Sequence, residues 1–335
     1  MKAEELGRGD AETRRRGDPR EAGPHTLKLE PADKVVIAYL SIIALLILIF
    51  SYRIESWGWF CALHAILIAI VLLLARLEHS ALRRVAASPR RPFAPPSPRP
   101  PVASFVRGWY PVVLMFVTYK ELTFLIPRVH PHDFDATLAA FDYRLFGVNP
   151  TVWLEPVTWP PLTEILQLTY STYYFLPVIL GAVLWSKGWF DKFRFWVFVV
   201  VLGFYLSYLG YIAVPAIGPR FLTSIVAAQT KPLAGVLFFN SIRQALDRVE
   251  GITRDCFPSG HTELTLLVLY YAYKFHRKTF WWLLPFGTGI IISTVYLRYH
   301  YVVDVFAGAL LAVAVVLIAK PLHGLLGGKL AQRGV

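Results

Sequence analysis

Eight long apolar segments constrain this chain more than any other feature of its sequence. Each is on the order of 17–25 residues, the length with which an α-helix crosses the hydrocarbon core of a bilayer. The segments lie near 34–53, 57–76, 107–127, 162–186, 193–214, 259–277, 280–298 and 301–320. Because a backbone in lipid must satisfy its own hydrogen bonds, the sequence predicts an all-α, polytopic membrane helix bundle with about eight transmembrane helices.

The composition supports a membrane protein. Of the 335 residues, 56% are hydrophobic and only 17% are charged, whereas soluble proteins carry about 25% charged residues. The formal net charge of +12 would fit a nucleic-acid partner. The basic residues instead flank the apolar segments, as the positive-inside rule requires, so we expect a bilayer and no nucleic acid as partner.

Charge bias between the segments predicts the orientation. Basic residues gather before the first segment, between the second and third, the fourth and fifth, and the sixth and seventh, and after the eighth. With eight spans these places share one side of the membrane. We therefore expect both termini in the cytoplasm of a multi-pass protein, in a bacterial plasma membrane, with residues 128–160 and 215–258 on the opposite side.

Four regions follow from this pattern. Residues 1–33 have no apolar core and are predicted to form a disordered cytoplasmic tail. Residues 34–106 hold two extra spans and a stiff, basic, proline-rich linker. Residues 107–320 form the predicted six-helix catalytic core, which includes an interfacial helix at 134–146. Residues 321–335 are a short cytoplasmic tail.

The segment Pro258-Ser259-Gly260-His261 opens the sixth span. Proline, serine and glycine at a helix start leave backbone N–H groups free at the positive end of the helix dipole, where phosphate binds well. His261 would then serve as a proton donor. The alternative is an ordinary capped helix with an interfacial histidine.

A second polar group lies at the boundary of the seventh and eighth spans. His300 and Asp304 are four residues apart and share a helical face. A carboxylate bonded to one imidazole nitrogen fixes the tautomer and leaves the other nitrogen free to attack. Arg298 adds a donor fork suited to phosphate oxygens, and Arg220, just past the fifth span, could be a second clamp. The alternatives are a structural histidine–aspartate pair and a snorkelling arginine.

By the predicted topology these groups all emerge on the extracytoplasmic face. Together they supply a nucleophile, a general acid and anion stabilisation for phosphoryl transfer. Two histidines and an aspartate can also bind a metal, but the arginines beside them would repel a cation, so no metal or other cofactor is expected. A lipid-binding or transport protein without chemistry is the third possibility.

Two segments carry a family resemblance. Cys256-Phe-Pro-Ser-Gly-His-Thr262 and Tyr296-Leu-Arg-Tyr-His-Tyr-Val-Val-Asp-Val305 resemble the second and third motifs of the type 2 phosphatidic acid phosphatase superfamily. Their order, their separation and the span arrangement also match, over roughly 107–320.

The resemblance implies a role for each motif residue. His300 would be the nucleophile that forms a phosphohistidine, Asp304 would orient it, and His261 would protonate the leaving group. Ser259 and Gly260 would be phosphate ligands.

The sequence departs from the usual motifs at two places. Ala213 replaces the first-motif lysine, and Thr294 replaces the third-motif arginine, with arginine at Arg298 instead. These departures, the stretch 142–147 and the two extra spans resemble the branch of inositol phosphorylceramide and sphingomyelin synthases.

The resemblance to this branch implies a lipid phosphotransferase. It would move a phosphate or an inositol phosphate-type headgroup from a phospholipid donor to a lipid or alcohol acceptor. Hydrolysis by a lipid phosphate or isoprenoid diphosphate phosphatase, with water as acceptor, is the alternative.

Other polar residues have open readings. Cys61 and Cys256 are expected as free thiols, with a single bridge as the alternative. Lys120 and Glu121 could bind a headgroup or make two separate interhelical contacts. Glu263 is expected to have no role. A strip of tyrosines is expected in an aromatic belt or in helix packing; its members are Tyr170, Tyr173, Tyr174, Tyr205, Tyr208 and Tyr211.

Overall fold

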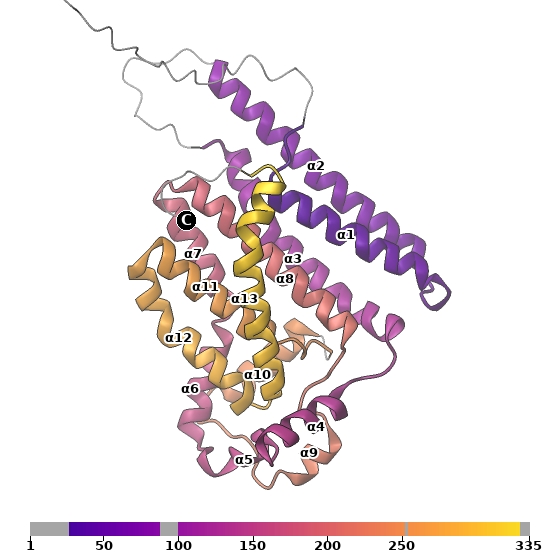
Figure 1. The fold of residues 1–335 in the computed structure, drawn as a ribbon, viewed down its shortest axis with the longest axis vertical. Helices are drawn as coiled ribbons and strands as arrows, with labels where there is room; N and C mark the ends of the chain where they lie inside the picture. Colours follow the sequence, from indigo (N-terminus) through magenta and orange to yellow (C-terminus); the bar gives the residue numbers. More distant parts are fainter. Residues whose placement is uncertain (1–26, 88–99, 252–253, 329–335) are drawn as a thin grey trace, which may run out of the picture.

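The described part of the protein is helical throughout and contains no β-strand (Figure 1). The computed structural model describes residues 27–87, 100–251 and 254–328. The α-helices are α1 (Pro31–Ile49), α2 (Trp57–Ala87), α3 (Val102–Val129), α4 (Asp135–Phe146), α5 (Pro150–Trp153), α6 (Pro160–Ser171), α7 (Phe175–Ser186), α8 (Phe190–Ala213), α9 (Thr223–Ala228), α10 (Phe239–Glu250), α11 (Gly260–Phe275), α12 (Arg277–Tyr296) and α13 (Val302–Leu325).

Helix α8 is the centre of the bundle. It packs against α1, α3, α7, α11 and α13, and 72% of its most apolar window is buried. A helix that is apolar on all sides can bury all of them against neighbours. The candidate site therefore rests on helices that share one central support.

All eight predicted segments form helices. In the described part of the chain five helices, α1, α2, α8, α12 and α13, are long and apolar enough to cross a membrane, and α6 with α7 would make a sixth span with a 48° bend. The other two segments form α3 and α11, of which α11 has only 16 residues. A polytopic, all-α membrane protein is thus confirmed as the fold class.

The predicted boundaries differ from the structure at five places, one of which is the end of α13 at Leu325, inside the predicted 321–335 tail. Helix α1 begins at Pro31, inside the predicted tail, because Glu30 and Asp33 form a capping box there. Helix α2 continues to Ala87 and α3 starts at Val102, so helix replaces much of the predicted linker. The fourth segment breaks between α6 and α7. The rest of the tail, 1–26, and residues 88–99 of the linker lie outside the described residues.

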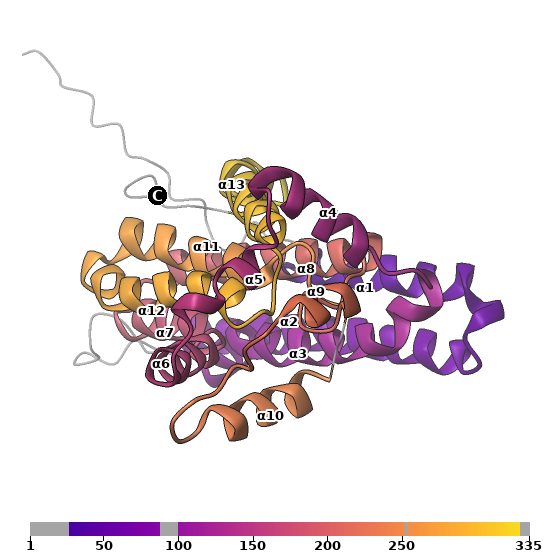
Figure 2. The same ribbon diagram turned by 90° about the horizontal axis from the view of Figure 1, so that it is seen from below.

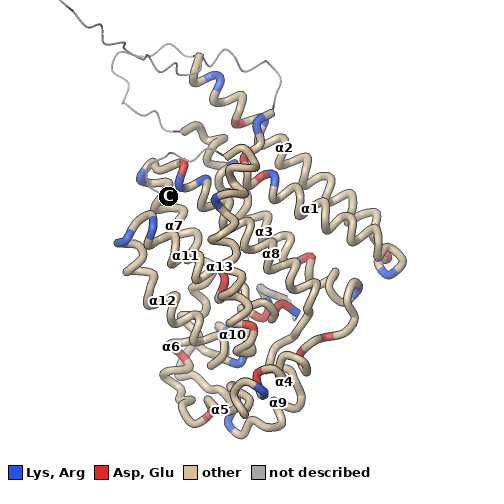
Figure 3. Tube along the Cα trace, viewed as in Figure 1, with Lys and Arg blue, Asp and Glu red and all other residues tan. Residues whose placement is uncertain are grey.

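The two ends of the bundle differ. Helices α4, α5, α9 and α10 gather at one end (Figures 1 and 2). At the opposite end, lysine and arginine gather where α7 meets α8 and α11 meets α12 (Figure 3). Helix α4 forms where the interfacial helix was predicted and ends at Gly147, in a left-handed conformation with φ 72°.

Candidate active site

The two predicted motifs meet where α11 and α13 begin. The backbone N–H of Ser259 donates to the carbonyl of Asp304 over 3.1 Å. Gly308, one turn further along α13, lies so close that an added Cβ would be 2.3 Å from the Ser259 oxygen. As a result the rings of His261 and His300 face each other edge to face, with centres 5.7 Å apart.

The contacts of His300 fix its tautomer. Its Nδ1 lies 2.8 Å from the Cys256 carbonyl oxygen. Because a carbonyl oxygen can only accept, Nδ1 carries the proton, and Nε2 of the neutral ring keeps its lone pair. The side chain is 4% exposed. His300 is therefore held with one nitrogen available for nucleophilic attack.

Asp304 lies beside His300 but does not bond it directly. Its Oδ2 is 3.6 Å from the Nδ1 of His300. The same oxygen accepts from the Cys256 thiol at 2.8 Å and from the Tyr301 N–H at 2.9 Å. The sequence predicts a direct carboxylate–imidazole bond, whereas here Cys256 provides the orienting carbonyl and Asp304 provides a nearby negative charge.

His261 is clamped between two tyrosine rings. The Tyr170 ring stacks on it with centres 4.4 Å apart, and the Tyr173 ring lies 4.1 Å away. The Tyr170 hydroxyl lies 3.5 Å from Nδ1. Within the described structure Nε2 of His261 is buried and has no hydrogen-bond partner. A buried imidazole nitrogen without a partner is suited to exchange a proton with a bound group.

The clamp contains residues that sequence reasoning assigned to packing. Tyr170 lies in the last turn of α6, and Tyr173 lies in the break between α6 and α7. The Tyr173 hydroxyl also donates to the Gly260 carbonyl over 3.2 Å. The bend between α6 and α7 thus brings both rings to His261. In the sequence, the only sign of this was the three-residue spacing of Tyr170 and Tyr173, which places them on one face of a helix.

The predicted phosphate ligands of the second motif are engaged in the protein itself. Ser259 caps α11, since its hydroxyl oxygen accepts from the Thr262 N–H at 3.3 Å. Gly260 lies against Tyr211, where an added Cβ would be 2.3 Å from the tyrosine oxygen. Both residues sit at the start of α11, whose first N–H groups lie at the positive end of the helix dipole.

Arg220 lies over Tyr299, the residue before the predicted nucleophile. Its guanidinium carbon is 4.5 Å from the ring centre, and its Nη1 is 2.9 Å from Asp247 Oδ1 of α10. Arg243 of α10, which the sequence did not single out, also lies over Tyr299, at 5.8 Å. The Tyr299 ring stacks in turn on Tyr170, with centres 4.5 Å apart. Two arginines therefore lie close to this aromatic stack.

Arg298 has different neighbours from those predicted. Its guanidinium donates to the side chains of Gln229 and Glu155 and to the Lys231 carbonyl, over 2.7, 3.1 and 2.8 Å. Its backbone is left-handed, with φ 66°, a conformation that residues other than glycine rarely adopt. These contacts fasten the segment after α9 to the turn before His300.

Two buried aspartates of the α4 region support the third motif. Asp142 accepts from the N–H groups of Val302 and Val303 at 2.8 Å each, and so caps α13. Burial raises its pKa, and these two hydrogen bonds oppose the rise. Asp135 accepts from the Tyr301 hydroxyl at 2.9 Å. Sequence analysis placed both residues on the outer side of the membrane and used Asp142 only as part of the stretch 142–147 that resembles the synthase branch.

The remaining polar residues resolve into separate contacts. Glu121 lies 3.3 Å from the Nε2 of His64 on α2, while the ammonium of Lys120 lies 5.9 Å from the Phe116 ring centre. Glu263 accepts from the Ser207 hydroxyl. Cys61 and Cys256 are both free thiols.

A metal ligand set is present by residue type. Cys256, His300 and Asp304 place three potential ligand atoms within 4.8 Å of one another. Burial and the neighbouring Asp304 charge raise the pKa of the Cys256 thiol. The thiolate that would bind a metal is therefore disfavoured, and the thiol proton instead bonds Asp304.

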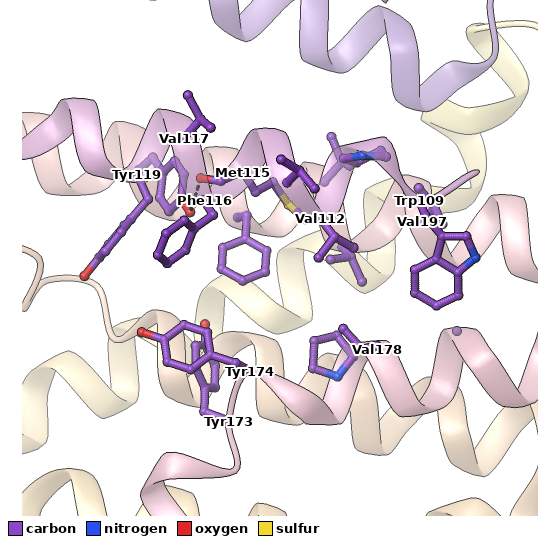
Figure 4. Close-up of a pocket in the computed structure, with 18 of the residues that line it drawn as sticks. Trp109, Val112, Met115, Phe116, Val117, Tyr119, Tyr173, Tyr174, Val178 and Val197 are labelled. Atoms are coloured by element: carbon purple, nitrogen blue, oxygen red, sulfur yellow. Dashed lines mark hydrogen bonds between the residues drawn. The ribbon is translucent and has the colours of Figure 1, made fainter. Parts of the chain in front are cut away.

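A cavity of about 470 Å³ opens beside His261. Helices α3, α7 and α8 supply most of its walls, and nearly all of the lining is aliphatic or aromatic (Figure 4). Figure 4 shows side chains of α3, such as Val112 and Phe116, facing Tyr173 and Tyr174 across this space. The site thus combines a polar pair of histidines with an apolar chamber.

Comparison with known proteins places the chain. Residues 136–318 match the PAP2 superfamily. Because this region is more than half of the chain, the protein belongs to that superfamily, and the resemblance seen in the second and third motifs is confirmed at this level.

Two relatives share parts of the chain. A PA-phosphatase related-family protein of Dictyostelium discoideum is 26% identical over 163 residues, which are 43% of this chain and 30% of that protein. Bacitracin transport permease protein BcrC of Bacillus licheniformis is 42% identical over 57 residues, which are 17% of this chain and 28% of that protein. The chain thus spans less than a third of the length of either relative. No solved structure matches.

Proposed function

We propose that the protein is an integral-membrane lipid phosphotransferase that works through a phosphohistidine at His300. The observation that carries this proposal is the pairing of His300 and His261 at the end of an apolar cavity. The substrates would be a phospholipid donor and a lipid or alcohol acceptor. The group transferred is proposed to be an inositol phosphate-type headgroup, because the departures from the usual motifs resemble the branch of inositol phosphorylceramide and sphingomyelin synthases.

The first half of the reaction uses the tautomer of His300. Its Nε2 attacks the phosphorus of the donor and forms an N–P bond, while the bond from phosphorus to the lipid oxygen breaks. His261 gives its proton to that oxygen, so that the lipid leaves as an alcohol. The negative charge of Asp304 stabilises the positive imidazolium of His300 as it forms.

The second half reverses the roles. The hydroxyl of an acceptor gives its proton to His261, its oxygen attacks the phosphorus, and the N–P bond to His300 breaks. Tyr170 and Tyr173 cover the two faces of His261, and the space beside it is the apolar cavity. This surrounding favours a lipid alcohol over water as acceptor, because water gains few partners in an apolar chamber.

The phosphate is proposed to lie between the start of α11 and Arg220. The backbone N–H groups of Gly260 and His261, in the first turn of α11, favour an anion there. Arg220 would have to exchange part of its contact with Asp247 for phosphate oxygens. For Arg298 the contacts favour a positioning role, because its donors hold the segment that precedes α10.

The proposed orientation follows from the two ends of the bundle. His261 and His300 lie where α11 and α13 begin, and Figure 3 shows the basic α7–α8 and α11–α12 junctions at the other ends of these helices. Under the positive-inside rule those junctions are cytoplasmic. We therefore propose an extracytoplasmic active site, with both ends of the chain in the cytoplasm.

Incubation with labelled phospholipid, with and without candidate alcohols, tests the function. Transfer of label to an alcohol, with little free phosphate or free headgroup phosphate, is the expected result. Release of free phosphate or free headgroup phosphate in the absence of an alcohol acceptor would instead establish the alternative, a lipid phosphatase. His300→Ala should abolish either reaction, and His132→Ala, a histidine on the surface of the outer loop, is the matched control.

Two further outcomes would reject the proposal. Unchanged function in the His300→Ala variant would leave a lipid-binding or transport protein without this chemistry. Loss of activity with a chelator and its return with a divalent metal would point to the Cys256, His300 and Asp304 cluster as a metal site.

A further inference from the structure

The apolar cavity has a defined shape along α8. Helices α3 and α7 both pack against α8, and the lining residues Val113 and Phe116 of α3 remain 67% and 43% exposed. The cavity is therefore open on the side between α3 and α7. A hydrocarbon chain could enter there directly from the lipid around the bundle.

One end of the cavity is polar. Among the described residues that line it, Asp255 and His261 are the only titratable side chains apart from tyrosines. The Asp255 carboxylate accepts from the Tyr119 hydroxyl at 2.6 Å. A lipid in the cavity would thus place its oxygen at this end and its chain in the remainder.

Aromatic rings close the opposite end. Phe193 is 1% exposed, and its ring centre lies 5.3 Å from that of Trp109 and 5.0 Å from that of Trp185. Beyond Phe193 lies a second cavity of about 280 Å³, and Phe193 lines both cavities. Its ring is thus part of the wall that separates them.

We propose that the cavity binds one extended hydrocarbon chain of the lipid substrate and that Phe193 sets the longest chain that fits. This inference rests on the proposed function, since it takes the lipid oxygen to lie at His261. Along α3 the cavity runs from Gly108 to Tyr119, which is roughly 17 Å at 1.5 Å per residue. Carbon–carbon bonds of about 1.5 Å advance a zigzag chain by ~1.3 Å per carbon, so roughly 13 carbons fill the cavity.

The length of the hydrocarbon chain would then affect turnover through how well the chain fits the cavity. A chain in the cavity and a chain in the bilayer both have apolar surroundings, so transfer between them adds little affinity. A chain that exceeds the cavity must bend out through the side opening. We expect about a tenfold loss of turnover for such chains, the lower end of what hydrophobic pockets achieve, because the opening relieves part of the misfit.

The test measures transfer of phosphate from a graded series of n-alkyl phosphates to one fixed alcohol acceptor, in detergent micelles at constant mole fraction. Phe193→Ala should move the fall in turnover to longer chains by opening the second cavity, with Phe193→Leu as the milder variant. Val200→Phe, in the cavity wall, should move it to shorter chains. Phe198→Ala removes an equally buried ring of α8 that does not line the cavity, and it should leave the chain-length profile unchanged.

A binding measurement separates this inference from the proposed function. In a His300→Ala background, alkyl phosphates that carry bromine at the chain end should quench the fluorescence of Trp109 only when the chain reaches the closed end of the cavity. Trp109→Phe should remove that component of the quenching. Length-dependent quenching in a wild-type protein that transfers label neither from alkyl phosphates nor from phospholipid would retain the chain site and reject the proposed function. Quenching independent of length, with one profile for all Phe193 and Val200 variants, would overturn the inference.

Discussion

Substitution of Gly308 by alanine tests the geometry that joins the two histidines. The added methyl would lie 2.3 Å from the Ser259 carbonyl oxygen and 3.2 Å from the Thr262 Cβ, whereas ordinary contact begins at 3.4 Å. The start of α11 and helix α13 must therefore separate by about 1 Å, and His261 would move away from His300. A misplacement of ~1 Å costs roughly 100-fold in rate.

The free energy of unfolding of the Gly308→Ala variant should fall by about 2 kcal/mol at most. Overpacking costs about 1–3 kcal/mol, and the better helix propensity of alanine returns about 1 kcal/mol. Gly324→Ala is the matched control. Gly324 lies on the same helix as Gly308, and a methyl group added there would have no neighbouring atom within 4 Å. Turnover of labelled donor and thermal unfolding in detergent are the two assays. A wild-type rate for Gly308→Ala, or an equal loss for Gly324→Ala, would refute the reasoning.

Three further predictions concern the supports of the site. Asp142→Ala should destabilise the protein by about 1–2 kcal/mol, because two N–H groups at the start of α13 lose their cap; thermal unfolding measures this, and an unchanged transition would contradict it. Tyr173→Phe keeps the ring against His261 and should lose less activity than Tyr173→Ala; equal kcat values would show that the ring has no part. Because burial raises the pKa of the Cys256 thiol, this thiol should stay protonated and resist maleimide at neutral pH until the protein unfolds, as peptide mapping can show.

The fold was accessible from the sequence because its strongest signal is local. Apolar length alone located the eight segments that became helices. It could not show that the fourth segment breaks at residues 172–174, where the bend places Tyr170 and Tyr173 against His261. Helix α2 likewise extends to Ala87 through polar residues that a hydropathy pattern excludes.

The site was only partly accessible. The sequence predicted that the regions of His261 and His300 meet, and the structure brings them together. The role of Asp142 was missed because its partners are backbone N–H groups 160 and 161 residues away. Arg298 was predicted as a phosphate ligand from its proximity to His300, but its left-handed backbone and its bond to Glu155 give it other contacts. Spacing along a chain does not reveal such turns.

The stereochemical course at phosphorus tests the central claim most directly. A phosphohistidine at His300 requires two displacements, each of which inverts the phosphorus, so transfer from a donor made chiral with isotopes and sulfur should proceed with net retention. A single direct displacement by the acceptor would give inversion. Net retention is the predicted result, and net inversion would contradict His300 as the nucleophile.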